Sequence, residues 1–172
     1  MSEIVSRYRA ARKSGDLVVL EGLHAVKHAL RFGARLLEAR SPDPAAALAL
    51  ARELAPDVAP DLDRLLAPTA PETFRSLAPA PPPTRVIALA HRPDVDLEDL
   101  MRDPDPAPVV VLERPTHHGN IGAVVRVAAA AGAAGVLVTG PHDPWHAAAV
   151  RGGAGLQFAL PVARVQAVPF PA

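Results

Sequence analysis

The sequence contains no cysteine among its 172 residues. This absence excludes disulfide bonds, zinc sites with thiolate ligands and catalysis by a cysteine nucleophile. Aromatic residues make up only 3% of the chain, although 49% of it is apolar. The hydrophobic core must therefore be built mainly from Ala, Val and Leu.

Long apolar runs are absent as well. No stretch of about 18 consecutive apolar residues could form a transmembrane helix, and the N-terminal residues lack the apolar region of a signal peptide. Together with the absence of cysteine, these features predict a cytoplasmic protein that does not contact the membrane.

Lysine is scarce, because 16 of the 18 basic side chains are arginine, and the net charge of zero conceals an uneven distribution. Residues 1–40 hold eight basic and four acidic side chains, residues 41–108 hold six and twelve, and residues 109–172 hold four and two. This asymmetry would permit contact with a polyanion at either end of the chain. It is weaker than the basic surface of a dedicated nucleic-acid-binding protein, and a solvated surface of mixed charge is the simpler alternative.

Local patterns predict an α/β fold in two parts. In the first part, helices are predicted at residues 6–13, 24–32, 45–54, 61–66 and 71–77, and strands at 17–20, 35–39 and 85–90. In the last part, strands are predicted at residues 109–112, 135–139 and 157–160, and helices at 120–131 and 144–150. We therefore predict one domain over residues 1–91, an acidic and proline-rich linker over 92–107 with one or two helical turns near 97–101, and a second domain over 108–172.

The second domain is predicted to contain a parallel sheet. The run at 109–112 is apolar without alternation, as in a buried parallel strand, and the helix after it leads to another strand, which makes a strand–helix–strand unit. Three strands and two helices form a thin sheet whose apolar faces need further cover. A partner or additional polypeptide would have to supply that cover.

The only asparagine of the chain, Asn120, lies where the first of these strands gives way to its helix. A strand, a glycine-containing turn and a polar helix start are typical of sites for charged ligands, and Gly119 and Gly122 would let the backbone approach a ligand. Alternatively, Asn120 caps the helix through its side chain. Arg126 follows in an otherwise apolar stretch, where it either extends to solvent or binds an anion through its guanidinium fork.

The histidines do not predict a metal site. His117 and His118 are adjacent and should point apart, while Pro144 places His142 outside the helix that would hold His146 at the i+4 position. Without a third ligand nearby, we expect no metal. The glycine-rich residues 151–155 follow a helix instead of preceding one, so they do not form a phosphate-binding loop.

Three segments resemble the SpoU/TrmH family of RNA 2′-O-ribose methyltransferases, which belongs to the SPOUT superfamily. Residues 113–132 are similar to its first motif, Asn-(Ile/Leu)-Gly-Ala-x-x-Arg-x-Ala-x-x-x-Gly, with His117-His118 in place of the usual Asp-Pro. Residues 143–162 are similar to the segment that follows, and residues 17–30 resemble the opening of the family's N-terminal substrate-binding domain.

The resemblance implies a small α/β RNA-binding domain followed by a knotted α/β methyltransferase domain that forms homodimers. It also implies S-adenosylmethionine as cofactor and tRNA or rRNA as substrate. The family's Gly-x-Glu-like and Ser-Leu-Asn-like motifs, which form the cofactor pocket, have no counterpart in the sequence. We therefore expect the chain to hold only the N-terminal part of the methyltransferase domain, and no cofactor-binding residue is identified.

The resemblance assigns Arg126 to the catalytic position and Asn120 to its supporting position. Because a guanidinium group stays protonated in proteins, Arg126 is a poor general base and is better suited to hold an RNA phosphate and stabilise a developing 2′-alkoxide. A non-catalytic RNA-binding module and an unrelated nucleotide-binding protein are the alternatives. The predicted RNA-binding residues are Arg7, Arg9, Arg12, Lys13 and Arg151.

Overall fold

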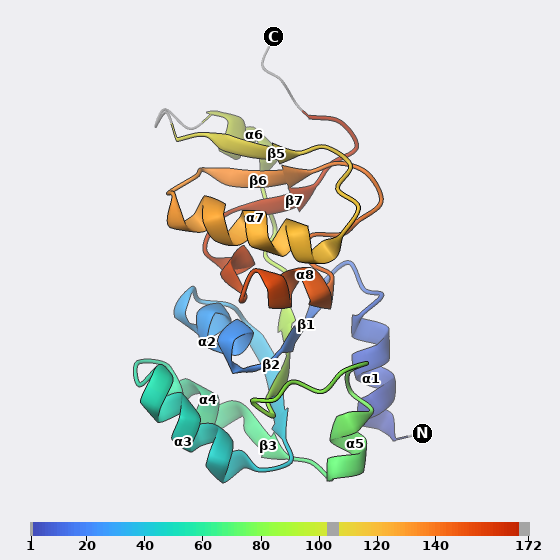
Figure 1. Cartoon of the computed structure of the whole chain (residues 1–172), viewed down its shortest axis with the longest axis vertical. Helices are drawn as coiled ribbons and strands as arrows, with labels where there is room; N and C mark the ends of the chain where they lie inside the picture. The colour runs from blue at the N-terminus through green and yellow to red at the C-terminus, as the bar shows by residue number, and fades with distance from the viewer. Residues whose placement is uncertain (1, 103–106, 169–172) are drawn as a thin grey trace.

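The computed structural model describes residues 2–102 and 107–168. Figure 1 shows two sheets stacked along the long axis of the molecule, with helices between them and around the lower sheet. We call residues 2–91 the first half, and residues 97–102 and 107–168 the second half. No helix of the described residues is long and apolar enough to cross a membrane.

The first half contains a four-stranded sheet with five helices. Its elements are α1 (Glu3–Ala11), β1 (Leu17–Glu21), α2 (Leu23–Arg31), β2 (Leu36–Ser41), α3 (Pro44–Leu54), α4 (Ala59–Leu65), β3 (Leu66–Pro68), α5 (Pro71–Arg75) and β4 (Ile87–His91). The strand order is β1-β4-β2-β3; β4 runs antiparallel to β1 and β2, and β3 runs parallel to β2. The sequence predicted every one of these elements except β3, which begins where a helix was expected to end.

The second half contains a parallel three-stranded sheet. Its elements are α6 (Leu97–Arg102), β5 (Val109–Leu112), α7 (His118–Ala130), β6 (Gly135–Val138), α8 (Ala147–Gly152), the 3-10 turn η1 (Leu156–Phe158) and β7 (Val162–Arg164). The strand order is β5-β6-β7, and both pairs are parallel. The predicted α/β class and the parallel strand–helix–strand unit are confirmed. β6 is buried throughout, whereas β5 is an edge strand on which Val111 is 41% exposed.

The third strand was predicted at residues 157–160 and this prediction is wrong. Gly155 has a positive φ of 79° and starts η1 in place of a strand. Phe158 packs edge-on against Trp145, with ring centroids 5.0 Å apart, so its apolar side chain is partly buried without a sheet. The strand forms after Pro161 instead. The helix predicted from residue 144 likewise begins later, at Ala147, because Asp143 binds the backbone N–H of Trp145 in a turn.

The two halves share one hydrophobic core. A single cluster of buried apolar residues contains Leu20 and Val26 of the first half together with Ile121 and Val150 of the second. In Figure 1, α8 lies between the second sheet and the elements β1 and α2. The first half therefore supplies much of the cover that the thin second sheet needs, which the sequence had led us to expect from a partner or from additional polypeptide. The linker boundaries at 92–107 stay a prediction, although Leu100 of α6 packs against Gly135 of β6.

Candidate functional site

The loops after β5 and β6 meet at the carboxyl edge of the parallel sheet. Arg114 adopts a positive φ of 46°, and its backbone N–H donates to Thr139 Oγ1 at 3.0 Å. Gly140, with φ 84°, packs directly against Arg114. A cavity of about 500 Å³ opens beside these loops, lined also by Glu113, Val111 and residues 166–168. Ligands of open parallel sheets bind at this edge.

Asn120 lies in the first turn of α7 and is exposed. The alternative that Asn120 caps the helix is wrong, because α7 begins at His118 and His117 occupies the N-cap position without a side-chain hydrogen bond. Within the described part of the chain, the Asn120 side chain makes no hydrogen bond. Its amide is therefore available to a ligand.

Arg126 is also exposed, six residues further along α7. At 1.5 Å per residue and 100° of rotation, the two positions are about 9 Å apart along the axis and on different faces. Arg126 makes no ion pair with any other described residue, and it lines a second cavity of about 550 Å³ between the two halves. The chain alone does not bring the two motif side chains together.

Gly122 has a structural role that the sequence did not reveal. A methyl group at this position would overlap the carbonyl oxygen of Ala149 and lie 2.5 Å from the backbone nitrogen of Gly153. The missing side chain thus allows α7 to pack directly on α8. The expectation that Gly122 lets the backbone approach a ligand is wrong, whereas Gly119 has open space beside it.

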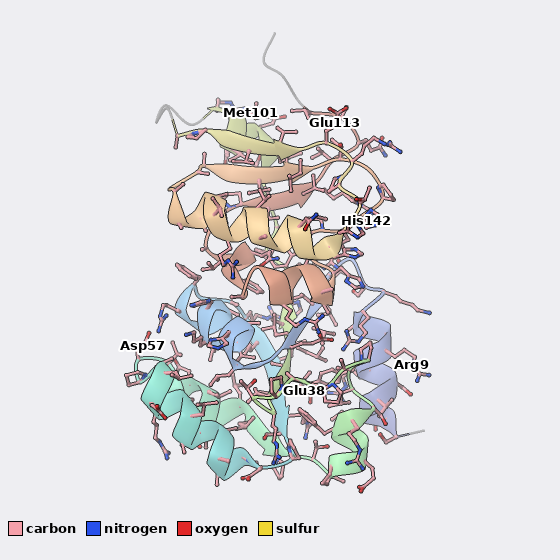
Figure 2. The ribbon with its side chains drawn as sticks, viewed as in Figure 1. Arg9, Glu38, Asp57, Met101, Glu113 and His142 are labelled. Carbon is pink, nitrogen blue, oxygen red and sulfur yellow. The ribbon has the colours of Figure 1, made fainter. Side chains whose placement is uncertain are left out.

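Three of the predicted RNA-binding residues are paired with carboxylates, and two are exposed without such a partner among the described residues. Arg12 and Arg151 both pair with the carboxylate of Glu21, at 2.8 and 3.1 Å, and Glu21 is only 3% exposed. Arg12 also donates to the carbonyl oxygen of Leu77 at 2.7 Å. Arg7 pairs with Glu3 and Glu38. Arg9 and Lys13 are exposed. Figure 2 shows Arg9 pointing outward from α1.

Three histidines that sequence reasoning kept apart converge at the N-terminal end of α7, where Figure 2 labels His142. The ring of His118 stacks on that of His146, with centroids 4.0 Å apart, and meets the ring of His142 edge-on at 4.8 Å. The i,i+4 spacing of His142 and His146 is the available signal in the sequence, although Pro144 places His142 outside the helix. The turn at Pro144 in fact folds both rings toward His118.

The surroundings of His118 and His146 disfavour their protonated forms. Burial lowers the pKa of His118 and of His146, and neighbouring positive charge lowers both further. His146 Nδ1 accepts the backbone N–H of Ala148 at 3.2 Å, which places its ring proton on Nε2. No group of three or more His, Asp or Glu side chains among residues 2–102 and 107–168 is arranged to hold a metal ion.

Comparison with known proteins identifies the class. Among solved structures, the SpoU methyltransferase AviRb of Streptomyces viridochromogenes, in complex with AdoMet, matches 97% of this chain with a TM-score of 0.75 and 26% identity. An AdoMet-bound rRNA methyltransferase of Sinorhizobium meliloti matches 95% of it with a TM-score of 0.70 and 25% identity. The chain thus has the fold of the SpoU-type methyltransferases.

The sequence of the second half resembles the same class. Residues 107–169 match the SpoU rRNA Methylase family, which confirms the resemblance. A 23S rRNA (uridine(2479)-2′-O)-methyltransferase of Streptomyces viridochromogenes is 38% identical over 84 residues. This alignment covers 48% of the chain and 29% of that relative. The chain likewise spans 64% and 61% of the two solved structures.

Proposed function

We propose that the protein methylates a ribose 2′-hydroxyl of ribosomal RNA with S-adenosylmethionine as methyl donor. The observation that carries the proposal is the SpoU motif on α7, whose Asn120 and Arg126 side chains are both exposed. The rRNA methyltransferase relatives favour rRNA over tRNA as the substrate class. A cytoplasmic location follows from such a substrate.

Arg126 suits the electrostatic part of this reaction. The 2′-oxygen must lose its proton as it bonds to the methyl carbon, whose bond to the donor sulfur would break with the electron pair left on sulfur, so negative charge develops on that oxygen. A guanidinium group holds a phosphate by two hydrogen bonds and stabilises developing oxyanion charge. Because a guanidinium group is a poor proton acceptor, the proton passes to another acceptor or to water. Asn120 would orient the RNA from the first turn of the same helix.

The carboxyl edge of β5–β7 fits part of a cofactor site. Its cavity of about 500 Å³ falls within the range of small-molecule pockets. The lining combines the apolar Val111 with the carboxylate of Glu113 and the hydroxyl of Thr139, which match the apolar and polar parts of a nucleoside. S-adenosylmethionine, when bound, supplies the methyl group on its sulfonium sulfur. Glu113 and Thr139 would hold and orient it.

We also propose that the protein is a homodimer. Val127 is 66% exposed on α7, and Val111 is 41% exposed on the edge strand β5. Exposed apolar side chains on the motif helix and on the edge strand of one sheet are features of a subunit interface. A second copy would supply the remaining cover of the second sheet.

Methyl transfer tests the function directly. The protein, as its gene encodes it, is incubated with labelled S-adenosylmethionine and unmodified rRNA transcript, and the product is hydrolysed with alkali. A 2′-O-methyl group blocks alkaline cleavage at its own nucleotide, so the label must appear in dinucleotides. Arg126→Ala should lower the rate at least about a hundredfold, whereas Arg52→Ala, an exposed arginine of α3, should not change it.

The outcomes separate the two candidate functions. Unchanged transfer in Arg126→Ala would remove Arg126 from the reaction. RNA binding without methyl transfer would instead favour the non-catalytic RNA-binding module, and label that remains in alkali-sensitive nucleotides would point to base methylation.

A further inference from the structure

A groove separates the two halves beside Arg126. Its first wall is the turn from β1 into α2, with Glu21, Gly22, His24 and Ala25, and its floor is the proline-rich segment Ala80–Thr84. Arg126 of α7, Arg151 of α8 and Ala154 form the opposite wall. The groove has a volume of about 550 Å³. The lining residues are far apart in the sequence, from Glu21 to Ala154, and they meet only in the folded protein.

The walls of the groove are firmly held. Thr84 Oγ1 accepts the backbone N–H of Leu23 at 2.9 Å, which ties the proline-rich segment to the start of α2. Three consecutive prolines, 81–83, fix φ along that segment. Across the groove, a ring nitrogen of His28 lies 2.7 Å from the carbonyl oxygen of Ala154. A ligand would therefore bind a surface that is already ordered, so that ordering the protein on binding would cost little free energy.

The groove carries positive charge. Its only carboxylate, Glu21, is buried and neutralised by Arg12 as well as by Arg151. Arg126 has no carboxylate partner among the described residues, and Arg151 remains 53% exposed although it is paired. Both guanidinium groups can therefore donate hydrogen bonds to an anion, which their planar forks bind in bidentate fashion.

The basic residues 7–13 are arranged differently. Arg7 pairs with Glu38 and Arg12 with Glu21, so a phosphate would have to compete with these carboxylates, as it would for Arg151 in the groove. Only Arg9 and Lys13 remain exposed without a partner in the described residues. RNA bound there would contact only these two unpaired charged groups, and both are at the ends of flexible side chains.

We propose that the groove between the halves, and not α1, binds the phosphate backbone of the substrate RNA and leads a single strand to Arg126. The proposal rests on the proposed function and specifies where its substrate lies. The groove's volume suits about one or two nucleotides. Enzymes that select one RNA nucleotide mostly act on unpaired segments, whose bases and riboses are accessible.

The experiment places negative charge at the groove without touching its arginines. In the double variant His24→Glu/Ala80→Glu, both positions are exposed. A glutamate at position 24 lies in the first turn of α2, where the helix dipole favours a carboxylate. The matched control is Arg9→Glu on α1, which changes the net charge by the same amount. Binding of unmodified 23S rRNA transcript is measured for both variants over a series of salt concentrations.

The double variant should bind the transcript about tenfold more weakly at about 0.1 M salt and show a smaller salt slope, whereas Arg9→Glu should bind nearly as the wild type does. The groove is ruled out if Arg9→Glu alone weakens binding or if neither variant does. If the folded wild-type protein does not bind the transcript at all, the proposed function fails together with the groove. If the wild-type protein binds the transcript and the double variant binds it equally well, the groove proposal is refuted and the proposed function is not. Circular dichroism of each variant shows that its fold is retained.

Discussion

Glu21 and Arg151 are 130 residues apart in the sequence, yet the Arg151 guanidinium donates to the Glu21 carboxylate at 3.1 Å. Arg12 reaches the other oxygen of the same carboxylate at 2.8 Å. One buried acidic side chain therefore joins α1, β1 and α8, and with them the two halves of the molecule. A buried carboxylate of this kind is costly to remove from water and depends on both partners.

Glu21→Gln should destabilise the protein by about 3 kcal/mol, because it leaves Arg12 without a charged partner at a mostly buried position. Unfolding in urea gives this free energy. Glu38→Gln is the control, since Glu38 is also largely buried and pairs with two arginines, Arg7 and Arg40, but only within the first half. Hydrogen exchange of the α8 amides should accelerate in Glu21→Gln and not in Glu38→Gln. Equal acceleration in both variants would show that Glu21 does not join the halves.

Gly122→Ala should disrupt the contact between α7 and α8. The new methyl group would meet backbone atoms of Ala149 and Gly153, which cannot move aside as a side chain can. We expect a loss of more than about 3 kcal/mol in the free energy of unfolding. Gly119→Ala, one turn earlier on the same helix and without a neighbour within 4 Å, should stabilise the helix by up to about 1 kcal/mol. A tolerated Gly122→Ala would mean that the two helices are not packed this closely.

The histidine cluster should make stability depend on pH. Burial is the largest cause that lowers the folded-state pKa of His118 and His146 below the 6.5 of an unfolded chain. Repulsion from the other two histidines, for His118, and from Arg12 and Arg151, for His146, lowers it further. The unfolded state therefore binds more protons, and this contribution is complete above about pH 6.5 and is lost as the pH falls through that value. The charged or titratable groups facing the two rings are His142, Asp143, Arg12, Glu21 and Arg151.

The comparison uses the double variant His118→Gln/His146→Asn, in which asparagine retains the helix-capping acceptor of residue 146. Urea unfolding at about pH 7.5 and about pH 5.5 should show a larger loss of stability in the wild type than in the variant. His24→Gln, at an exposed position, should follow the wild type. An equal loss in all three proteins would show that the cluster does not govern the response.

Local sequence patterns were sufficient for the elements that bury an apolar face. The strand Gly135–Val138 and the helix around Val26 were predicted because their apolar residues are directly buried. β3 and β7 were not predicted at their observed positions. Each has only three residues and forms by pairing with a neighbouring strand, so its own sequence carries little signal. The convergence of His118, His142 and His146, and the role of Gly122, depend on how α7 meets α8. No pattern within one segment carries that information.

A dimer would explain why Val127, on a helix of mostly small and apolar residues, is left 66% exposed. Val127→Asp would bury a charge in the proposed interface, at a cost of several kcal/mol of association energy, so it should convert the dimer to a monomer in sedimentation equilibrium. Leu54→Asp is the control, because Leu54 is an exposed apolar side chain of α3 in the first half. A wild-type protein that is monomeric at high concentration, or a Val127→Asp variant that remains dimeric, would exclude this helix from the interface. If dissociation also abolishes methyl transfer while RNA still binds, the second copy contributes to the reaction, as the separation of Asn120 from Arg126 within one chain leads us to expect.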